Sequence, residues 1–319
     1  MQCGAALRAR GVGPSRGTAA LILTHGGALS NLPLFLALDA GLVAARGVDV
    51  TAPPLAGFGS TASRLRDGTA DLGTTGFTQP LADADDADPL VIVAGSGLRG
   101  MAIVGRPGTA LDGLSGPVGT FADDPMQVLL ADAVARYGLA DRVEVRFLSS
   151  LAEAAGALVA GTLAAVTTVE PWIGRLLGQG FALLSDGTDL WGRDYPDTVL
   201  VGRRSTVAAR PEAVTAVIAA MLDAEALIAR DPDGALAAVA HRFPTFSPAE
   251  LRAGLAGQPP RVDLGGLEAA VFGRWPTVRR LAGRADGSPP PGLIDLTCLA
   301  AALRRADRAS APERISHVH

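Results

Sequence analysis

Residues 24–50 constrain the fold of this chain more strongly than any other stretch. A short apolar run ends just before Gly26 and Gly27, and leucines then recur at every fourth position, which is a helical spacing. Ser30 or Asn31 is placed to cap that helix, and a proline follows in its first turn, where a missing N–H costs nothing. A strand, a Gly-rich turn and a capped helix direct free N–H groups into a crevice. We therefore expect a small-ligand site at this turn, for an anion or a polar carbonyl.

Strand-like and helix-like segments alternate along the chain as far as residue 202, and helical patterns dominate after it. The expected strands cover 19–23, 48–51, 70–74, 90–94, 101–104, 117–120, 143–147, 164–169, 181–184 and 198–201. The expected helices cover 60–66, 125–137, 151–160, 211–230, 232–243, 248–256, 267–282 and 293–307, and a further one opens at Glu170-Pro171-Trp172.

This alternation predicts an α/β fold with two lobes, built on mixed, mainly parallel sheets and followed by a helical C-terminal extension. The length of 319 residues also favours two lobes over one small core. Lobe I is expected to take 18–105 and 203–305, and lobe II 106–202, with crossings near Arg106 and Gly202. Residues 1–17 and 306–319 are expected to be a disordered tail and a polar tail. Closure about such a hinge traps a ligand in the cleft.

Composition excludes several classes of function. The net charge of −4 gives no reason to expect nucleic acid or an anionic membrane as partner, and no apolar run is long enough to span a bilayer. The chain contains no lysine, which rules out a Schiff base, a pyridoxal phosphate anchor and a phosphate-loop lysine. Cys3 and Cys298 lie at opposite ends and form no metal pattern. We expect neither a cofactor nor a metal ion.

Four stretches, taken together and in this order, resemble the substrate-binding proteins of ABC importers for nitrate, sulfonates, taurine and thiamine-pyrimidine precursors. They are SNLPLFLALDAGLVAARGVDV, GTADLGTTG, LSGPVGTFADDP and LVAGTLAAVTTVEPW. The resemblance covers roughly residues 18–305. It implies the type 2 periplasmic-binding-protein fold, a small-molecule ligand and an ABC transporter permease as partner.

The sequence departs from the family pattern in three respects. Val43 stands where an aromatic residue is common, and Ala164 replaces the usual aspartate of the fourth stretch. The first residues do not form a secretory signal, because they contain arginines and glycines but no continuous apolar segment. The resemblance implies an extracytoplasmic location, and a cytoplasmic one is the alternative.

Candidate ligand contacts of the first lobe fall in four strand-to-helix turns. Each has a structural alternative: His25 as a neutral core histidine, Ser30 as a helix cap, Phe58 as a core side chain and Arg99 as a solvated surface cation. The backbone and hydroxyl donors are expected to contact the ligand, Phe58 to stack on it, and Arg99 to pair with a carboxylate or sulfonate. The four turns supply His25, Gly27, Ser30, Asn31, Phe58, Gly59, Ser60, Thr75, Gly76, Phe77, Ser96 and Arg99.

The second lobe is expected to contribute acidic and aromatic side chains. One of two aspartates caps the following helix, and the other accepts a hydrogen bond from a ligand amine or amide. Two acidic residues there argue against a strongly anionic ligand. Glu170 and Trp172 either bind a ring or merely open a helix with a core tryptophan. The candidates are Phe121, Asp123, Asp124, Glu170, Trp172 and Tyr195.

The leading functional hypothesis is a solute-binding protein that captures a small polar, heteroaromatic or organosulfur-type molecule for ABC import. The alternative is a cytoplasmic enzyme on the same fold, a decarboxylase, lyase or desulfinase-like protein acting on a small aromatic acid. Aromatic sulfinate desulfinases of similar fold use a cysteine in the first turn, where this chain has Gly26-Gly27-Ala28. A third possibility is a cytoplasmic metabolite sensor.

Overall fold

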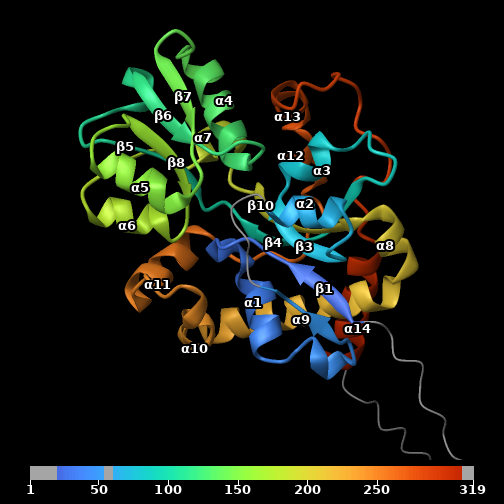
Figure 1. The fold of residues 1–319 in the computed structure, drawn as a ribbon. Coiled ribbons are helices and arrows are strands. Elements are labelled where there is room, and N and C mark those ends of the chain that lie inside the picture. Colours follow the sequence, from blue (N-terminus) through green and yellow to red (C-terminus); the bar gives the residue numbers. More distant parts are fainter. Residues whose placement is uncertain (1–19, 54–59, 311–319) are drawn as a thin grey trace, which may run out of the picture.

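Two lobes, each built on a five-stranded sheet, make up the computed structural model, which describes residues 20–53 and 60–310 (Figure 1). The tail expected at 1–17 lies outside the described residues. The polar tail expected from residue 306 begins later, because α14 continues to Ser310.

The first sheet has the strand order β2-β1-β3-β10-β4. β1 pairs in parallel with β2 and β3, whereas β10 is antiparallel to both of its neighbours, so four of the five strands run in one direction. The bounds are β1 Leu21–Thr24, β2 Val50–Thr51, β3 Leu72–Gly76, β4 Leu90–Leu98 and β10 Pro196–Arg203.

The second sheet repeats this plan in the order β7-β6-β8-β5-β9, with β5 as the reversed strand. Its bounds are β5 Met101–Gly105, β6 Gly116–Thr120, β7 Val143–Phe147, β8 Ala165–Val169 and β9 Ala182–Ser185. The prediction of an α/β fold with mixed, mainly parallel sheets is confirmed.

The chain changes sheets twice, and both changes come earlier than expected. β4 belongs to the first sheet and β5 to the second, so the first crossover lies at Arg99–Gly100 rather than near Arg106. The return lies within 186–195, before β10, rather than near Gly202. The expected division placed both reversed strands in the wrong lobe, because each reversed strand directly follows a crossover.

Helices cover both faces of the first sheet and surround the second (Figure 1). Their bounds are α1 Leu32–Asp39, α2 Ser60–Arg66, α3 Thr78–Ala82, α4 Pro125–Tyr137, α5 Leu151–Val159, α6 Trp172–Gly178, α7 Thr188–Trp191, α8 Arg204–Ala209, α9 Pro211–Arg230, α10 Pro232–Val239, α11 Pro248–Gly257, α12 Glu268–Phe272, α13 Trp275–Leu281 and α14 Thr297–Ser310.

The start and stop signals of the second lobe are where the sequence placed them. The Asp124 carboxylate accepts a hydrogen bond from the Met126 N–H at 2.9 Å, and Gly138 ends α4 in a left-handed conformation. The Ser150 hydroxyl likewise caps α5 by accepting from the Glu153 N–H at 3.1 Å.

Two segments differ from the expectation because they complete the edge of β4. Residues 259–262 and 293–295 run along that edge, with Gly95 N donating to Val262 O at 2.9 Å and Ile92 N to Leu293 O at 2.9 Å. The helix expected at 293–307 therefore starts only at Thr297. Covering the edge satisfies backbone groups that an open strand exposes.

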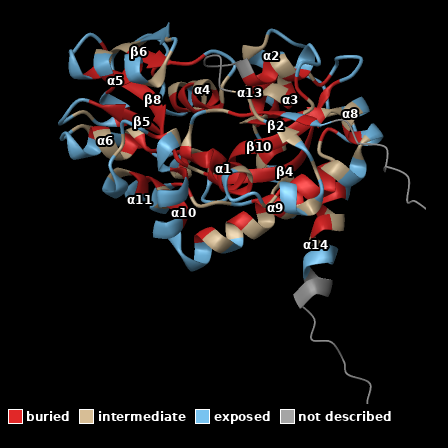
Figure 2. Ribbon diagram, turned by 60° about the horizontal axis from the view of Figure 1, so that its bottom comes forward, coloured by how far each residue is buried: buried red, intermediate tan, exposed pale blue. Residues whose placement is uncertain are grey.

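The core of each lobe lies between its sheet and the helices packed on it (Figure 2). In the first lobe, α1, α9 and α14 cover one face, where Leu200 and Met221 are fully buried. The other face holds a second cluster that includes Phe77 and Trp275. Strands β4 and β10 are thus buried on both faces, as the apolar runs at 90–94 and 199–201 indicate.

Replacing Leu200 with alanine is expected to lower the free energy of unfolding by about 2–5 kcal/mol, because it opens a cavity in the central strand of the first lobe. Leu183→Ala is the matched control, since that leucine on edge strand β9 is 48% exposed. Urea denaturation checks the pair. Equal losses for the two variants would contradict this assignment of the core.

Candidate ligand-binding cleft

A cavity of about 340 Å³ lies between the two lobes. Both lobes contribute to its wall, which is typical of a small-molecule site. The lining residues are Gly26, Gly27, Ala28, Asn31, Thr61, Ala62, Thr74, Thr75, Gly76, Gln79, Ala122, Asp123, Asp124, Met126, Ser149, Ser150, Leu151, Val169, Asp197 and Thr198.

The position of the cavity follows from the direction of the strands. Its wall is formed where β1, β3, β6, β7 and β8 end, which is the edge at which open α/β sheets bind ligands. β10 runs the other way, so it reaches the cavity with its first residues, Asp197 and Thr198.

Hydrogen bonds within the first lobe fix the wall formed by the first turn. The Thr74 hydroxyl donates to Asn31 Oδ1 at 2.5 Å, and Asn31 Nδ2 donates to Ala28 O at 2.9 Å. The side chain of Asn31 therefore holds its own turn and does not cap α1. Gly76 faces the other lobe directly, since a Cβ there would lie 2.3 Å from Pro125 Cδ.

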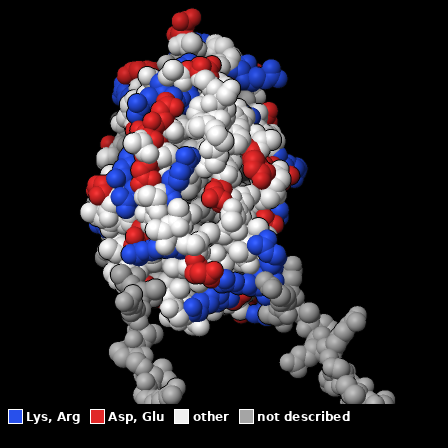
Figure 3. Space-filling model, turned by 90° about the vertical axis from the view of Figure 1, so that its right-hand side faces the viewer, with Lys and Arg blue, Asp and Glu red and all other residues white. Residues whose placement is uncertain are grey.

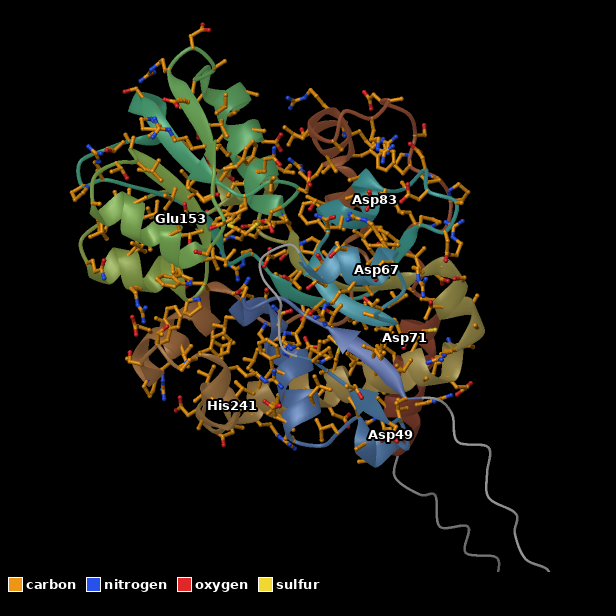
Figure 4. The ribbon with its side chains drawn as sticks, viewed as in Figure 1. Asp49, Asp67, Asp71, Asp83, Glu153 and His241 are labelled. Atoms are coloured by element: carbon orange, nitrogen blue, oxygen red, sulfur yellow. The ribbon has the colours of Figure 1, made fainter. Side chains whose placement is uncertain are left out.

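The wall of the second lobe consists of the N-terminal ends of α4 and α5. One N–H in the first turn of each helix already has a side-chain acceptor, the Met126 N–H in Asp124 and the Glu153 N–H in Ser150. Glu153, labelled in Figure 4, also accepts from the Ser149 N–H at 2.8 Å and from its hydroxyl at 2.6 Å. These side chains partly neutralise the positive ends of both helices.

A buried polar network lies beneath the cavity. Ser96 Oγ donates to Ser30 O at 2.6 Å, and Ser30 Oγ shares a hydrogen bond of 2.7 Å with Thr198 Oγ1. Asp197 Oδ2 accepts from Thr198 at 3.1 Å and from Gln258 Nε2 at 2.8 Å. Through Gln258, this network connects the floor of the cleft to the C-terminal end of α11.

Gln258 ties the two crossovers together. Its Nε2 donates to Arg99 O at 3.0 Å as well as to Asp197, and only 1% of the residue is exposed. Gly100 has a φ of +76° and packs so tightly that a Cβ would lie 2.3 Å from Gln258 Cδ. The hinge is therefore a closely packed point, and Gly100 is required there.

Two cleft aspartates have raised pKa values. Burial raises the pKa of Asp124 to about 7, although its cap hydrogen bond to Met126 opposes this, and the charge of Asp197 adds to it. Burial also raises the pKa of Asp197 to about 6, against the hydrogen bonds from Thr198, Ser30 and Gln258. Asp124 is only half-buried, because it faces the cavity while protein atoms surround it on its other sides.

Six of the residues expected at the site line the cavity, namely Gly27, Asn31, Thr75, Gly76, Asp123 and Asp124. Ser60 begins α2, next to the lining residue Thr61. Phe58 and Gly59 lie outside the described residues.

Ser30 and Ser96 lie below the cavity in the buried network, so they support the wall and do not line it. His25 packs edge-on against Phe35 at 4.9 Å between ring centres and contacts its neighbour's carbonyl through Nδ1. Burial lowers its pKa, which fits the alternative of a neutral core histidine.

Arg99 belongs to the first crossover, where its N–H donates to Tyr195 O at 3.1 Å. The segment at 259–262 covers this end of β4, so neither Ser96 nor Arg99 is among the lining residues. The sequence showed the strand end but not the distant segment that covers it.

Glu170 and Trp172 lie away from the cavity, contrary to the expectation. Glu170 is buried against α11, where a Cβ on Gly257 would lie 2.9 Å from its carboxylate. The ring of Trp172 meets Phe246 at 5.1 Å, and the Arg175 guanidinium lies over both rings. These residues form a contact between the lobes.

The aromatic side chains expected to line the site pack against one another or in the core instead. Tyr195 donates its hydroxyl to Asp186 O at 2.6 Å and packs edge-on against Trp191, which also meets Phe77. Phe121 is fully buried in the core of the second lobe. None of the predicted aromatic residues in the described part lines the cavity.

Sequence reasoning missed the cleft residues on two elements. Ser149 and Ser150 follow the carboxyl end of the strand expected at 143–147, which was a usable signal, but they are not among the expected ligand contacts. Asp197 and Thr198 lay at the beginning of a strand, and only knowledge of its reversed direction places them in the cleft.

Contacts at both rims hold the lobes together. On one side, Thr78 Oγ1 and Gln79 Nε2 donate to Asp123 O at 2.9 and 2.5 Å. On the other side, Arg175 on α6 pairs with Glu250 on α11 at 2.7 Å. Near the first of these contacts, Asp132 on α4 accepts from the C-terminal extension and from α7. Its donors are Trp191 at 2.8 Å, Arg274 at 3.2 Å and Thr277 at 2.7 Å.

The face drawn in Figure 3 carries arginine and acidic side chains interspersed, without a large patch of one sign. Among the described residues, no group of histidine, cysteine or acidic side chains is arranged to hold a metal ion. No helix in the same part of the chain is long and apolar enough to cross a membrane.

Solved structures with this fold include importer components and an enzyme. The alkanesulfonate-binding protein SsuA from Xanthomonas axonopodis, bound to MOPS, is 23% identical over 88% of this chain and 99% of its own, with a TM-score of 0.72. A ligand-binding component of an ABC-type import system from Staphylococcus aureus, with zinc bound, is 15% identical over 89% and 99%, with a TM-score of 0.74. The desulfurization enzyme DszB is 18% identical over 89% and 99%, with a TM-score of 0.65. At these identities the likeness establishes the fold.

No curated protein sequence matches the chain. The sequence profile of the NMT1-like family matches residues 17–242, which is most of the chain and includes both sheets and every residue that lines the cavity. The suspected kinship with solute-binding proteins of the sulfonate and nitrate type is thereby confirmed at the level of family and fold. This protein belongs to the NMT1-like family.

Proposed function

We propose that the protein is the solute-binding component of an ABC importer and that it captures a small polar molecule between its lobes. The cavity with both lobes in its wall is the observation that carries this proposal. Its volume of about 340 Å³ suits a small molecule.

The mechanism is closure of the cleft around the two crossovers. Arg99–Gly100 and 186–195 are the points where the chain passes between the sheets, so rotation about them moves one lobe relative to the other. The Arg175–Glu250 pair and the hydrogen bonds of Asp123 and Asp132 form across the gap. A ligand that contacts both walls favours the closed arrangement, because it gains the full set of contacts only there.

The partner in this proposal is a transporter permease, and the location is extracytoplasmic. Importer components and periplasmic binding proteins that share the fold support both parts of the proposal. The permease then recognises the closed, loaded form and releases the ligand by opening the cleft.

The enzymatic alternative draws on the fold that the chain shares with DszB. In the described part of the chain, the cavity wall contains no cysteine, and Cys298 is buried in α14 beside Pro211. The fate of a bound ligand therefore separates the two functions.

A screen of thermal stability against sulfonates, nitrate, carboxylates, pyrimidines and aliphatic amines is expected to reveal a ligand. At about 100 times its dissociation constant, a ligand adds about 2.7 kcal/mol to the stability of the folded state. Mass spectrometry after incubation is expected to recover that ligand unchanged. Its conversion into a product would establish catalysis and overturn the binding-protein assignment.

Replacing Ala122 with tryptophan is expected to abolish ligand-induced stabilisation, because the indole occupies the cleft from its second-lobe wall. Ala208→Trp on α8 is the matched control, since Ala208 is exposed and lies outside the cavity. Calorimetric titration of both variants with the ligand found in the screen checks this. Full affinity in Ala122→Trp would place the binding site elsewhere.

A further inference from the structure

The part of the cleft wall formed by described residues is acidic. It includes Asp123, Asp124 and Asp197, and none of the described residues in it is an arginine or a histidine. The chain carries 28 basic side chains, so this is not a shortage of arginine. Arg99, the cation expected at the site, lies at the first crossover instead.

Asp124 and Asp197 approach the cavity from opposite lobes, and neither forms an ion pair with a described residue. Asp197 is 4% exposed, and the side chains that hydrogen-bond to it, Thr198, Gln258 and Ser30, are uncharged. A buried carboxylate is costly without a cation, and raised pKa values are the usual result. Within the described residues, these two carboxylates therefore have no cationic partner.

The remainder of the wall favours an aliphatic ligand. Met126, Leu151 and Val169 provide apolar surface, and no aromatic ring of the described residues lines the cavity for stacking. Hydroxyl and amide groups, such as those of Thr75 and Gln79, complete the wall. One first-turn N–H of each helix at the cleft already donates to a side chain, which weakens the attraction of these N-termini for an oxyanion.

Resting on the proposed function, we infer that the cleft selects a small aliphatic cation, an ammonium or guanidinium compound, which Asp124 and Asp197 bind from opposite lobes. This ligand class differs from the alkanesulfonate bound by the protein from Xanthomonas axonopodis. Because each carboxylate belongs to a different lobe, the cation also links the lobes in the closed state.

Calorimetric titration at about pH 8 tests the ligand class with putrescine and agmatine as cations and with propanesulfonate and nitrate as anions. We expect at least one of the two cations to bind and neither anion to bind. Binding of an anion, or of neither cation, would overturn the inference about ligand class. An anion recovered unchanged would still leave the protein a solute-binding protein, whereas a probe converted to product would overturn the proposed function itself.

Asp124→Asn and Asp197→Asn are each expected to weaken binding of the cation by at least about tenfold, because each removes a buried charge partner. Asparagine caps a helix as well as aspartate does, so α4 remains intact in the first variant. Asp231→Asn is the matched control: Asp231 caps α10 in the same way, is exposed and lies outside the cavity. Equal affinities in the three variants would refute the role of the two carboxylates.

The pH dependence of binding tests the charge of the ligand independently. The charged group that acts on Asp124 across the cleft is Asp197, and Asp197 itself faces the hydroxyls of Thr198 and Ser30 and the amide of Gln258. Protons compete with a cation for these carboxylates. Affinity for the cation is therefore expected to fall as pH drops through about 7 to 6, where both pKa values lie. Affinity that rises over this range would indicate an anion site.

Discussion

Two hydrogen bonds from one buried amide, Gln258 Nε2 to Arg99 O and to Asp197 Oδ2, join the points at which the chain passes between its sheets. Everything in the cleft depends on this junction. It sets where β10 begins and thereby places Asp197 and Thr198 on the floor of the cavity. Gly100 has a left-handed backbone conformation and packs against the Gln258 side chain. A side chain at position 100 would therefore collide with Gln258. In the proposed mechanism, hinge motion occurs around this closely packed point.

The C-terminal extension adds contacts on both sides of that hinge. α11 meets α6 through the Arg175–Glu250 pair, and α13 meets α4 through Asp132. Salt bridges of this partly exposed kind contribute little stability individually. Their importance is geometric, because they close the rims only when the lobes are together. In the proposed mechanism, a ligand that contacts both walls adds to these contacts when the lobes close.

Much of this architecture was predictable from local sequence signals. Asp124, Gly138 and Ser150 fixed the ends of α4 and α5, because caps and left-handed glycines act within a few residues. The crossovers were placed too late, because the direction of a strand depends on partners far away in the chain. Arg99, Glu170 and Trp172 lie at strand ends, where the sequence predicts ligand contacts. The packing of residues 259–262 and of α11 shows that they lie outside the cavity wall. The expectation that acidic residues disfavour a strongly anionic ligand came from two neighbouring aspartates, and Asp197 now supports it from the opposite lobe.

The most direct test of a cleft that closes on its ligand is the distance between the lobes in solution. Spin labels at Asp141 on the second lobe and Ala208 on the first, in a chain with both native cysteines replaced, report that distance by pulsed electron resonance. We expect a broad distribution in the free protein and a narrower, closed one when a ligand from the screen is bound. A distribution that no bound ligand changes would contradict capture by hinge closure.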